Sequence, residues 1–151
     1  MNFEQYAQES NRFLKEIAAE LGNEQDTDGA YRVMRSVLHT LREMLSPEES
    51  LHLLAQLPLG IKGIYVDGWH LGTRDRIRSM SEFLTCVRAQ DERSAGRDFG
   101  DDETAKHHVK SVLNVLKRHV TVGEIQHVID QFPIELSELW LTEAGDGAIG
   151  R

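Results

Sequence analysis

Two copies of the pattern Glu-x-x-His have the spacing best suited to chemistry: Glu49 with His52, and Glu124 with His127. Residues three positions apart lie on one face of an α-helix, so both side chains of a pair can reach the same ion. Two such pairs on facing helices supply half of the ligands of a carboxylate-bridged di-metal site. Such a site needs two further inward-facing carboxylates, and the apolar stripes of the neighbouring helices present none.

A helix cap explains the two glutamates more simply. Glu49 lies three residues after Ser46, and Glu124 lies three residues after Thr121. In a capping box the hydroxyl accepts the backbone N–H of the glutamate, and the glutamate side chain accepts the N–H of the Ser or Thr. We therefore expect two capping boxes, histidines on a solvated helix face, and no cofactor. The alternative is a metal site with the candidate ligands Glu49, His52, Glu124 and His127.

Other residues with reactive side chains favour catalysis no more strongly. The neighbours His107 and His108 would point about 100° apart on a helix, which suits a shared metal poorly. Cys86 has no histidine or acid close by in the sequence, so a structural thiol is favoured over a nucleophile. Gly123 would fall inside a helical turn if Thr121 caps that helix, which argues against a helix-turn-helix. We therefore name no catalytic residue, and an enzyme is not the favoured class.

The composition is that of a soluble globular protein. The chain has 151 residues, of which 40% are hydrophobic and 28% are charged. It has 17 Lys and Arg against 25 Asp and Glu, a formal charge of −8 that argues against a nucleic-acid surface. The single cysteine fits a reducing compartment, no apolar run is long enough for a membrane span, and the first residues do not resemble a signal peptide. We expect a cytoplasmic protein that binds neither nucleic acid nor membranes.

The sequence contains an internal repeat. A shift of 75 positions aligns Ser36–Leu38 with Ser111–Leu113 and Gln56–Pro58 with Gln131–Pro133. A copy of this size would be marginal alone, so we expect both copies to share one core around a pseudo-two-fold axis. The predicted organisation is a single domain over residues 1–141, with one copy at 1–66, a linker at 67–79, a second copy at 80–141, and a flexible tail at 142–151.

The hydrophobic periodicity is helical. Apolar residues recur every three to four positions in both copies, and no segment alternates as a β-strand does. The predicted fold class is all-α, a helical bundle of two tandem four-helix repeats, in which residues 91–100 form a polar loop. The third helix is expected to bury Leu51, Leu54 and Leu57. The predicted core contains Leu14, Ile17, Val37, Leu41, Leu54, Phe83, Val112, Leu116, Ile129 and Phe132.

Several runs resemble a known family. They are Leu45–Glu49, Ala55–Pro58, and Ile64 and Tyr65 followed by Gly68 and Trp69. This pattern resembles the bacterial domain-of-unknown-function 2267 family, and the likeness extends from the first helix to about Leu141. The resemblance implies an all-helical fold and a bacterial, cytoplasmic setting. It implies no activity and supplies no catalytic residues.

The favoured function is a non-catalytic interaction module that binds a protein partner or associates with itself. Its contacts would be aromatic side chains left exposed by the core, with arginines of the linker. These arginines and Trp69 could also bind phosphate or a base, but we favour Trp69 as a plug between the copies. The alternative function is small-ligand or metal binding, at the seam between the copies or at the Glu-x-x-His motifs. The candidate partner contacts are Tyr65, Trp69, Arg74, Arg76 and Trp140.

Overall fold

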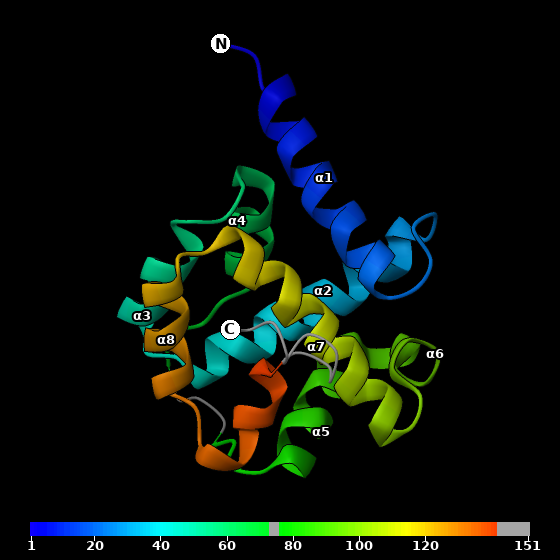
Figure 1. Ribbon diagram of the computed structural model, residues 1–151, viewed down its shortest axis with the longest axis vertical. Coiled ribbons are helices and arrows are strands. Elements are labelled where there is room, and N and C mark those ends of the chain that lie inside the picture. The colour runs from blue at the N-terminus through cyan, green and yellow to red at the C-terminus, as the bar shows by residue number, and fades with distance from the viewer. Residues whose placement is uncertain (73–75, 142–151) are drawn as a thin grey trace.

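The computed structural model describes residues 1–72 and 76–141, and in these ranges the chain forms helices and no strand. Figure 1 shows the helices gathered into one body, from which the first turns of α1 extend. The predicted all-α fold class is confirmed. In the described part of the chain, no helix is both long enough and apolar enough to cross a bilayer. The helices are α1 (Glu4–Glu20), α2 (Thr27–Met44), α3 (Pro47–Leu54), α4 (Leu59–Val66), α5 (Met80–Asp91), η1 (Glu92–Ser94), α6 (Ala95–Phe99), α7 (Asp102–His119), α8 (Val122–Asp130) and η2 (Ile134–Trp140), of which η1 and η2 are 3-10 helices.

The long helices α2 and α7 organise the core. Each begins at an aspartate N-cap: Asp26 accepts the N–H of Gly29 at 2.9 Å, and Asp101 accepts the N–H of Thr104 at 2.8 Å. α2 packs against α1, α5 and α7, and α7 also packs against α1 and η2. The predicted core residues Ile17, Val37, Leu41, Phe83, Val112, Leu116 and Phe132 are buried, and Leu14, Leu54 and Ile129 lie partly buried against them.

The inner face of α3 differs from the predicted one. Leu51 is 56% exposed and Leu54 is only partly buried, whereas Leu53 is fully buried. The buried face of α3 runs through Glu49, Ser50 and Leu53, because residues at spacings of three and four share one side of a helix. On α8, likewise, the buried residues are Glu124, Ile125 and Val128. Both glutamates of the Glu-x-x-His motifs therefore lie on inner helix faces, where α3 and α8 pack together.

Buried polar side chains of α2 hold the end of α4. The guanidinium of Arg42 donates to the carbonyl oxygens of Tyr65 at 2.7 Å and Asp67 at 2.8 Å. His39 donates through Nε2 to the carbonyl of Ile64 at 2.7 Å. Burial lowers the pKa of His39 to about 4, so its imidazole is neutral at physiological pH. These bonds satisfy the last carbonyls of a short helix, which would otherwise have no partner inside the protein.

Removal of the Tyr65 hydroxyl is expected to destabilise the protein. That hydroxyl is hydrogen-bonded to Ser50 Oγ at 2.7 Å, and both residues are fully buried. In Tyr65→Phe the serine hydroxyl loses its partner, which costs about 1–3 kcal/mol of the free energy of unfolding. Urea denaturation measures this loss. Tyr31→Phe is the control, because Tyr31 is 40% exposed and its variant should change stability by less than about 0.5 kcal/mol.

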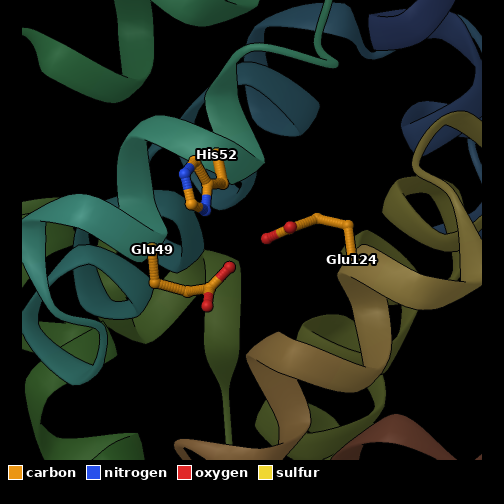
Figure 2. A group of neighbouring side chains, drawn as sticks. All are labelled: Glu49, His52 and Glu124. Carbon is orange, nitrogen blue, oxygen red and sulfur yellow. The ribbon is translucent and has the colours of Figure 1, made fainter.

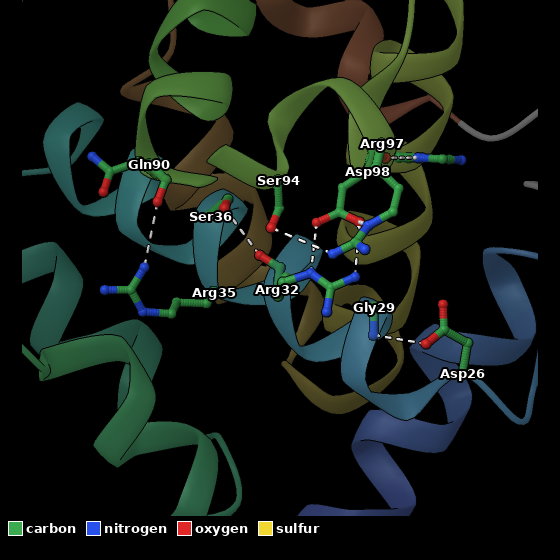
Figure 3. A network of polar contacts seen from close by, with 10 residues as sticks. Asp26, Gly29, Arg32, Arg35, Ser36, Gln90, Ser94, Arg97 and Asp98 are labelled. Carbon is green, nitrogen blue, oxygen red and sulfur yellow. Dashed lines mark hydrogen bonds and ion pairs between the residues drawn. The ribbon is translucent and has the colours of Figure 1, made fainter. Parts of the chain in front are cut away.

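The segment at residues 91–100 is helical, and the prediction of a polar loop there is wrong. It forms η1 and α6, and it is attached to α2 by a bidentate ion pair (Figure 3). Arg32 donates through Nε and Nη2 to Asp98 at 2.8 and 3.1 Å. The aromatic ring of Phe99 is also fully buried. The polar sequence of this segment and its two glycines do not indicate that Asp98 and Phe99 attach it to the core, because Arg32, the partner of Asp98, is remote in the chain.

Candidate functional site

Three helices begin with the pattern Ser/Thr-x-x-Glu, and α5 shows what the pattern does alone. Ser79 Oγ accepts the N–H of Glu82 at 3.2 Å, and Glu82 Oε1 accepts the N–H of Ser79 at 3.1 Å. The same carboxylate oxygen accepts the N–H of Arg78 at 2.8 Å. These bonds lower the pKa of Glu82, led by the one from Arg78. This capping box is complete and exposed, so its glutamate is fully used for helix initiation.

The starts of α3 and α8 make only half of this box. Ser46 Oγ accepts the N–H of Glu49 at 3.1 Å, and Thr121 Oγ1 accepts the N–H of Glu124 at 3.3 Å. The predicted N-cap residues are therefore confirmed. The prediction that the two glutamates close the boxes is wrong, because another side chain takes the N–H group that each would use.

That side chain is a glutamine that follows the C-terminal end of the other helix. The N–H of Ser46 donates to Gln131 Oε1 at 2.9 Å, and the N–H of Thr121 donates to Gln56 Oε1 at 2.7 Å. Gln56 follows the end of α3 and Gln131 follows the end of α8, so the two helices run antiparallel, each start beside the other's end. The sequence pattern gives no sign of this exchange, because the partners are 65 and 85 positions apart.

Both glutamates turn inward and meet each other beside a histidine. Figure 2 shows the carboxylates of Glu49 and Glu124 and the imidazole of His52 pointing into one space. One ligand atom from each of the three residues can be chosen so that all lie within 4.8 Å of one another. Glu49 is 9% exposed and Glu124 is 7% exposed, and the Oε2 atom of each is buried without a hydrogen-bond partner. Two buried carboxylates with unused oxygens are a costly arrangement unless a proton or a cation lies between them.

The electrostatics of this cluster agree with its geometry. Burial, followed by the hydrogen bond and negative charge of Glu49, raises the pKa of Glu124 to about 7. Gln131 Nε2 donates to Glu49 Oε1 at 3.4 Å. In the described part of the chain, no Arg or Lys forms an ion pair with either glutamate. Among the described residues, the cluster therefore has ligands for a metal ion but no paired Arg or Lys that would neutralise its two carboxylates.

These donors suit a divalent transition metal. Carboxylate oxygen and imidazole nitrogen bind Zn²⁺ at about 2.0–2.2 Å, which in a tetrahedron places ligand atoms about 3.4 Å apart. The candidate ligand atoms lie within 4.8 Å of one another, so a bound ion would require the side chains to move closer together. His127 lies at the edge of the cluster: its Nδ1 is 3.9 Å from Glu124 Oε1 and its side chain is 65% exposed. The structure thus brings together three of the four candidate ligands and places the fourth beside them.

The candidate partner contacts are placed less favourably. Tyr65 and Trp140 are 0% and 5% exposed, so the exposure that their proposed role requires is absent. Trp69 is partly buried, and its ring meets that of Tyr65 edge-on at 5.8 Å. Arg74 lies outside the described residues. Arg76 lines an open groove of about 610 Å³ together with Gln131.

The other reactive side chains considered in the sequence analysis, His107, His108 and Cys86, lie outside this cluster. His108 Nδ1 donates to the carbonyl of Asp98 at 2.7 Å, and its ring centre is 6.0 Å from that of His107. Cys86 lies partly buried against the core.

Comparison with known proteins adds the family. The model of an uncharacterized conserved protein family, DUF2267, matches residues 10–139. This chain belongs to the DUF2267 family. The match covers all of α3 and α8, so the whole cluster lies within the DUF2267 domain. It also covers Gln56, which belongs to the run Ala55–Pro58 that resembles the family. No curated protein matches the chain.

Proposed function

We propose that this protein binds one divalent transition metal ion between α3 and α8, with Glu49, His52 and Glu124 as ligands. The observation that carries the proposal is the pair of buried glutamates that face each other with unpartnered Oε2 atoms beside an imidazole. A cation at this point neutralises two charges whose burial otherwise opposes folding. The ion would tie a helix of the first half of the chain to a helix of the second half.

The donor set favours some metals over others. Ca²⁺ takes six to eight oxygen ligands and Mg²⁺ prefers an octahedron of oxygens, whereas this cluster offers only two carboxylates and one imidazole. Imidazole suits Zn²⁺, Ni²⁺ and Fe²⁺, and carboxylates also suit Mn²⁺. His52 is exposed, so water can complete the coordination from its side. We therefore expect Zn²⁺ or Mn²⁺ to bind more tightly than Mg²⁺ or Ca²⁺.

Calorimetric titration of the full chain, stripped of metal with a chelator, tests the proposal. Zn²⁺ should bind at one ion per chain, and Glu49→Gln, His52→Ala or Glu124→Gln should each weaken binding by more than about 10–100-fold, the loss typical of residues that only support a ligand. Glu48→Gln and His70→Ala are matched controls, because both residues are exposed and lie outside the cluster. Equal Zn²⁺ binding by the wild type and the Glu49→Gln/Glu124→Gln double variant would overturn the proposal.

Self-association is a second proposed function, supported by the projecting end of α1 (Figure 1). Phe3 and Tyr6 are 64% and 38% exposed there, with ring centres 6.1 Å apart. Exposed aromatic pairs of this kind suit protein contacts. Sedimentation over a range of concentrations should show a dimer that Phe3→Ala/Tyr6→Ala abolishes. A monomer at every concentration would count against self-association.

We also propose that residues 1–66 and 80–141 are tandem copies. The reciprocal bonds support this, since Gln56 and Gln131 are related by the same shift of 75 positions as Ser46 and Thr121. A cytoplasmic location is proposed as well, supported by the cysteine content, since the sequence has one cysteine and so can form no intramolecular disulfide.

A further inference from the structure

We infer that Gln56 and Gln131 are positioning residues for the metal ligands, each holding one glutamate out of the capping box that its own helix start would form. The inference rests on the proposed function, because it concerns the readiness of Glu49 and Glu124 to bind a cation. The proposed ligands are Glu49, His52 and Glu124, and the glutamines act on two of them.

The three helix starts provide a comparison within one molecule. At α5 the N–H of Ser79 donates to the Glu82 carboxylate of its own helix. At α3 the equivalent N–H, on Ser46, donates to Gln131, and the Glu49 carboxylate faces α8 instead. The local pattern is the same, so the difference between the two glutamates follows from the glutamine that reaches only one of them.

The chemistry of the amide fits this role. An amide oxygen satisfies the N-cap N–H without adding charge, so the negative carboxylate remains available for a cation. The amide nitrogen adds a second contact at each site: Gln56 Nε2 reaches Thr121 Oγ1 at 3.4 Å, and Gln131 Nε2 reaches Glu49 Oε1 at 3.4 Å. Gln131 therefore holds both the N-cap of α3 and one of the proposed ligands.

Without the glutamine, the glutamate carboxylate should accept the N-cap N–H of its own helix and complete the capping box. In Gln131→Met the side chain keeps its length and loses its acceptor, so Glu49 is free to accept the Ser46 N–H in a complete capping box. A carboxylate engaged in a capping box has to leave that bond before it can bind metal. The same reasoning applies to Gln56→Met, the Thr121 N–H and Glu124.

Zn²⁺ titration of the full-length variants is the first test. Gln131→Met and Gln56→Met should each weaken Zn²⁺ binding by about 10–100-fold, the range found for residues that orient metal ligands. Gln126→Met is the matched control, because this α8 glutamine bonds to exposed Asp130 of its own helix and should leave the affinity unchanged. Equal affinities for Gln131→Met, Gln56→Met and Gln126→Met would overturn the inference.

Hydrogen exchange of the Ser46 amide separates positioning from general loosening. In Gln131→Met this amide should stay protected, because Glu49 replaces the glutamine, and it should exchange rapidly in Gln131→Met/Glu49→Ala. Rapid exchange already in Gln131→Met would mean that the variant merely loosens α3, and the inference would fail. This measurement needs no metal, so a wild-type protein that binds no Zn²⁺ would refute the proposed function and leave the exchange result to decide the role of the glutamines.

Discussion

Glu124→Gln is expected to stabilise the metal-free protein by about 1–3 kcal/mol at pH 8, with a much smaller gain at pH 5. Burial and then the neighbouring Glu49 raise the pKa of Glu124 from 4.5 to about 7. A raised carboxyl pKa means that the folded chain holds this proton more tightly than the unfolded chain does. The free energy of unfolding therefore falls as pH rises from 4.5 through 7, and the loss is complete above that range.

The amide of Glu124→Gln takes the place of the protonated acid at every pH. It can donate to Glu49 without adding charge, so the variant lacks the loss that the wild type suffers between pH 4.5 and 7. Urea denaturation with a chelator at pH 5 and pH 8 measures the difference, and Glu48→Gln controls for net charge. A gain that is equal at both pH values would contradict the prediction. Zn²⁺ should reverse the order at pH 8, because the ion stabilises only the chain that binds it.

Asp98→Ala is expected to destabilise the protein by about 2–3 kcal/mol. Its side chain is 5% exposed and accepts both bonds from Arg32, whose side chain is 29% exposed (Figure 3). Breaking a buried ion pair leaves an uncompensated charge at a cost of about 3–5 kcal/mol, and the partial exposure of Arg32 reduces this figure. Asp102→Ala is the control, because its pair with Arg88 is largely exposed and should contribute less than about 1 kcal/mol.

The same substitution should alter the pH dependence of stability. Burial, and then a hydrogen bond and like charge from Asp98, raise the pKa of Asp91 to about 7 from its usual 3.8. Asp91 therefore weakens the fold as pH rises from 3.8 through 7. In Asp98→Ala the hydrogen bond and like charge are gone, whereas burial and the opposing charges of Arg32 and Arg97 remain, so this pH-dependent loss should shrink. Thermal unfolding from pH 5 to pH 8 measures it, and similar curves for Asp98→Ala and the wild type would contradict this account.

Local sequence patterns were sufficient to predict the all-helical fold and the hydroxyl caps of α3 and α8. Ser46 and Thr121 are N-caps because the groups that each hydroxyl satisfies lie within three residues. The apolar periodicity of α2 and α7 likewise predicts their buried apolar residues, although α2 also buries polar residues between Ser36 and Arg42 that the pattern does not predict. Elements whose stabilising bonds are local are therefore readable from the sequence.

The inward orientation of the glutamates could not be predicted, because it depends on side chains remote in the chain. Glu49 has two competing partners, the N–H of Ser46 and the surroundings of Glu124, and Gln131 decides between them. The short α3 adds to the ambiguity, since eight residues support two plausible apolar stripes and Leu53, not Leu51, faces inward. The helical structure of residues 91–100 could not be predicted for the same reason, because Asp98 is held by Arg32, which is 66 positions away.

The reciprocal contact between α3 and α8 also sets an order of events during synthesis. Glu49 and Glu124 are 75 positions apart, so at about 5–20 residues per second the ribosome delivers the second glutamate about 4–15 s after the first. The contact between α1 and α7 spans a longer interval still, because Glu16 and His119, which meet at 3.1 Å, are 103 positions apart. Until then the nascent chain carries one carboxylate without its counterpart, and no ion can be held between them. A metal at this site would therefore bind after both helices have formed and packed, and it could not nucleate folding.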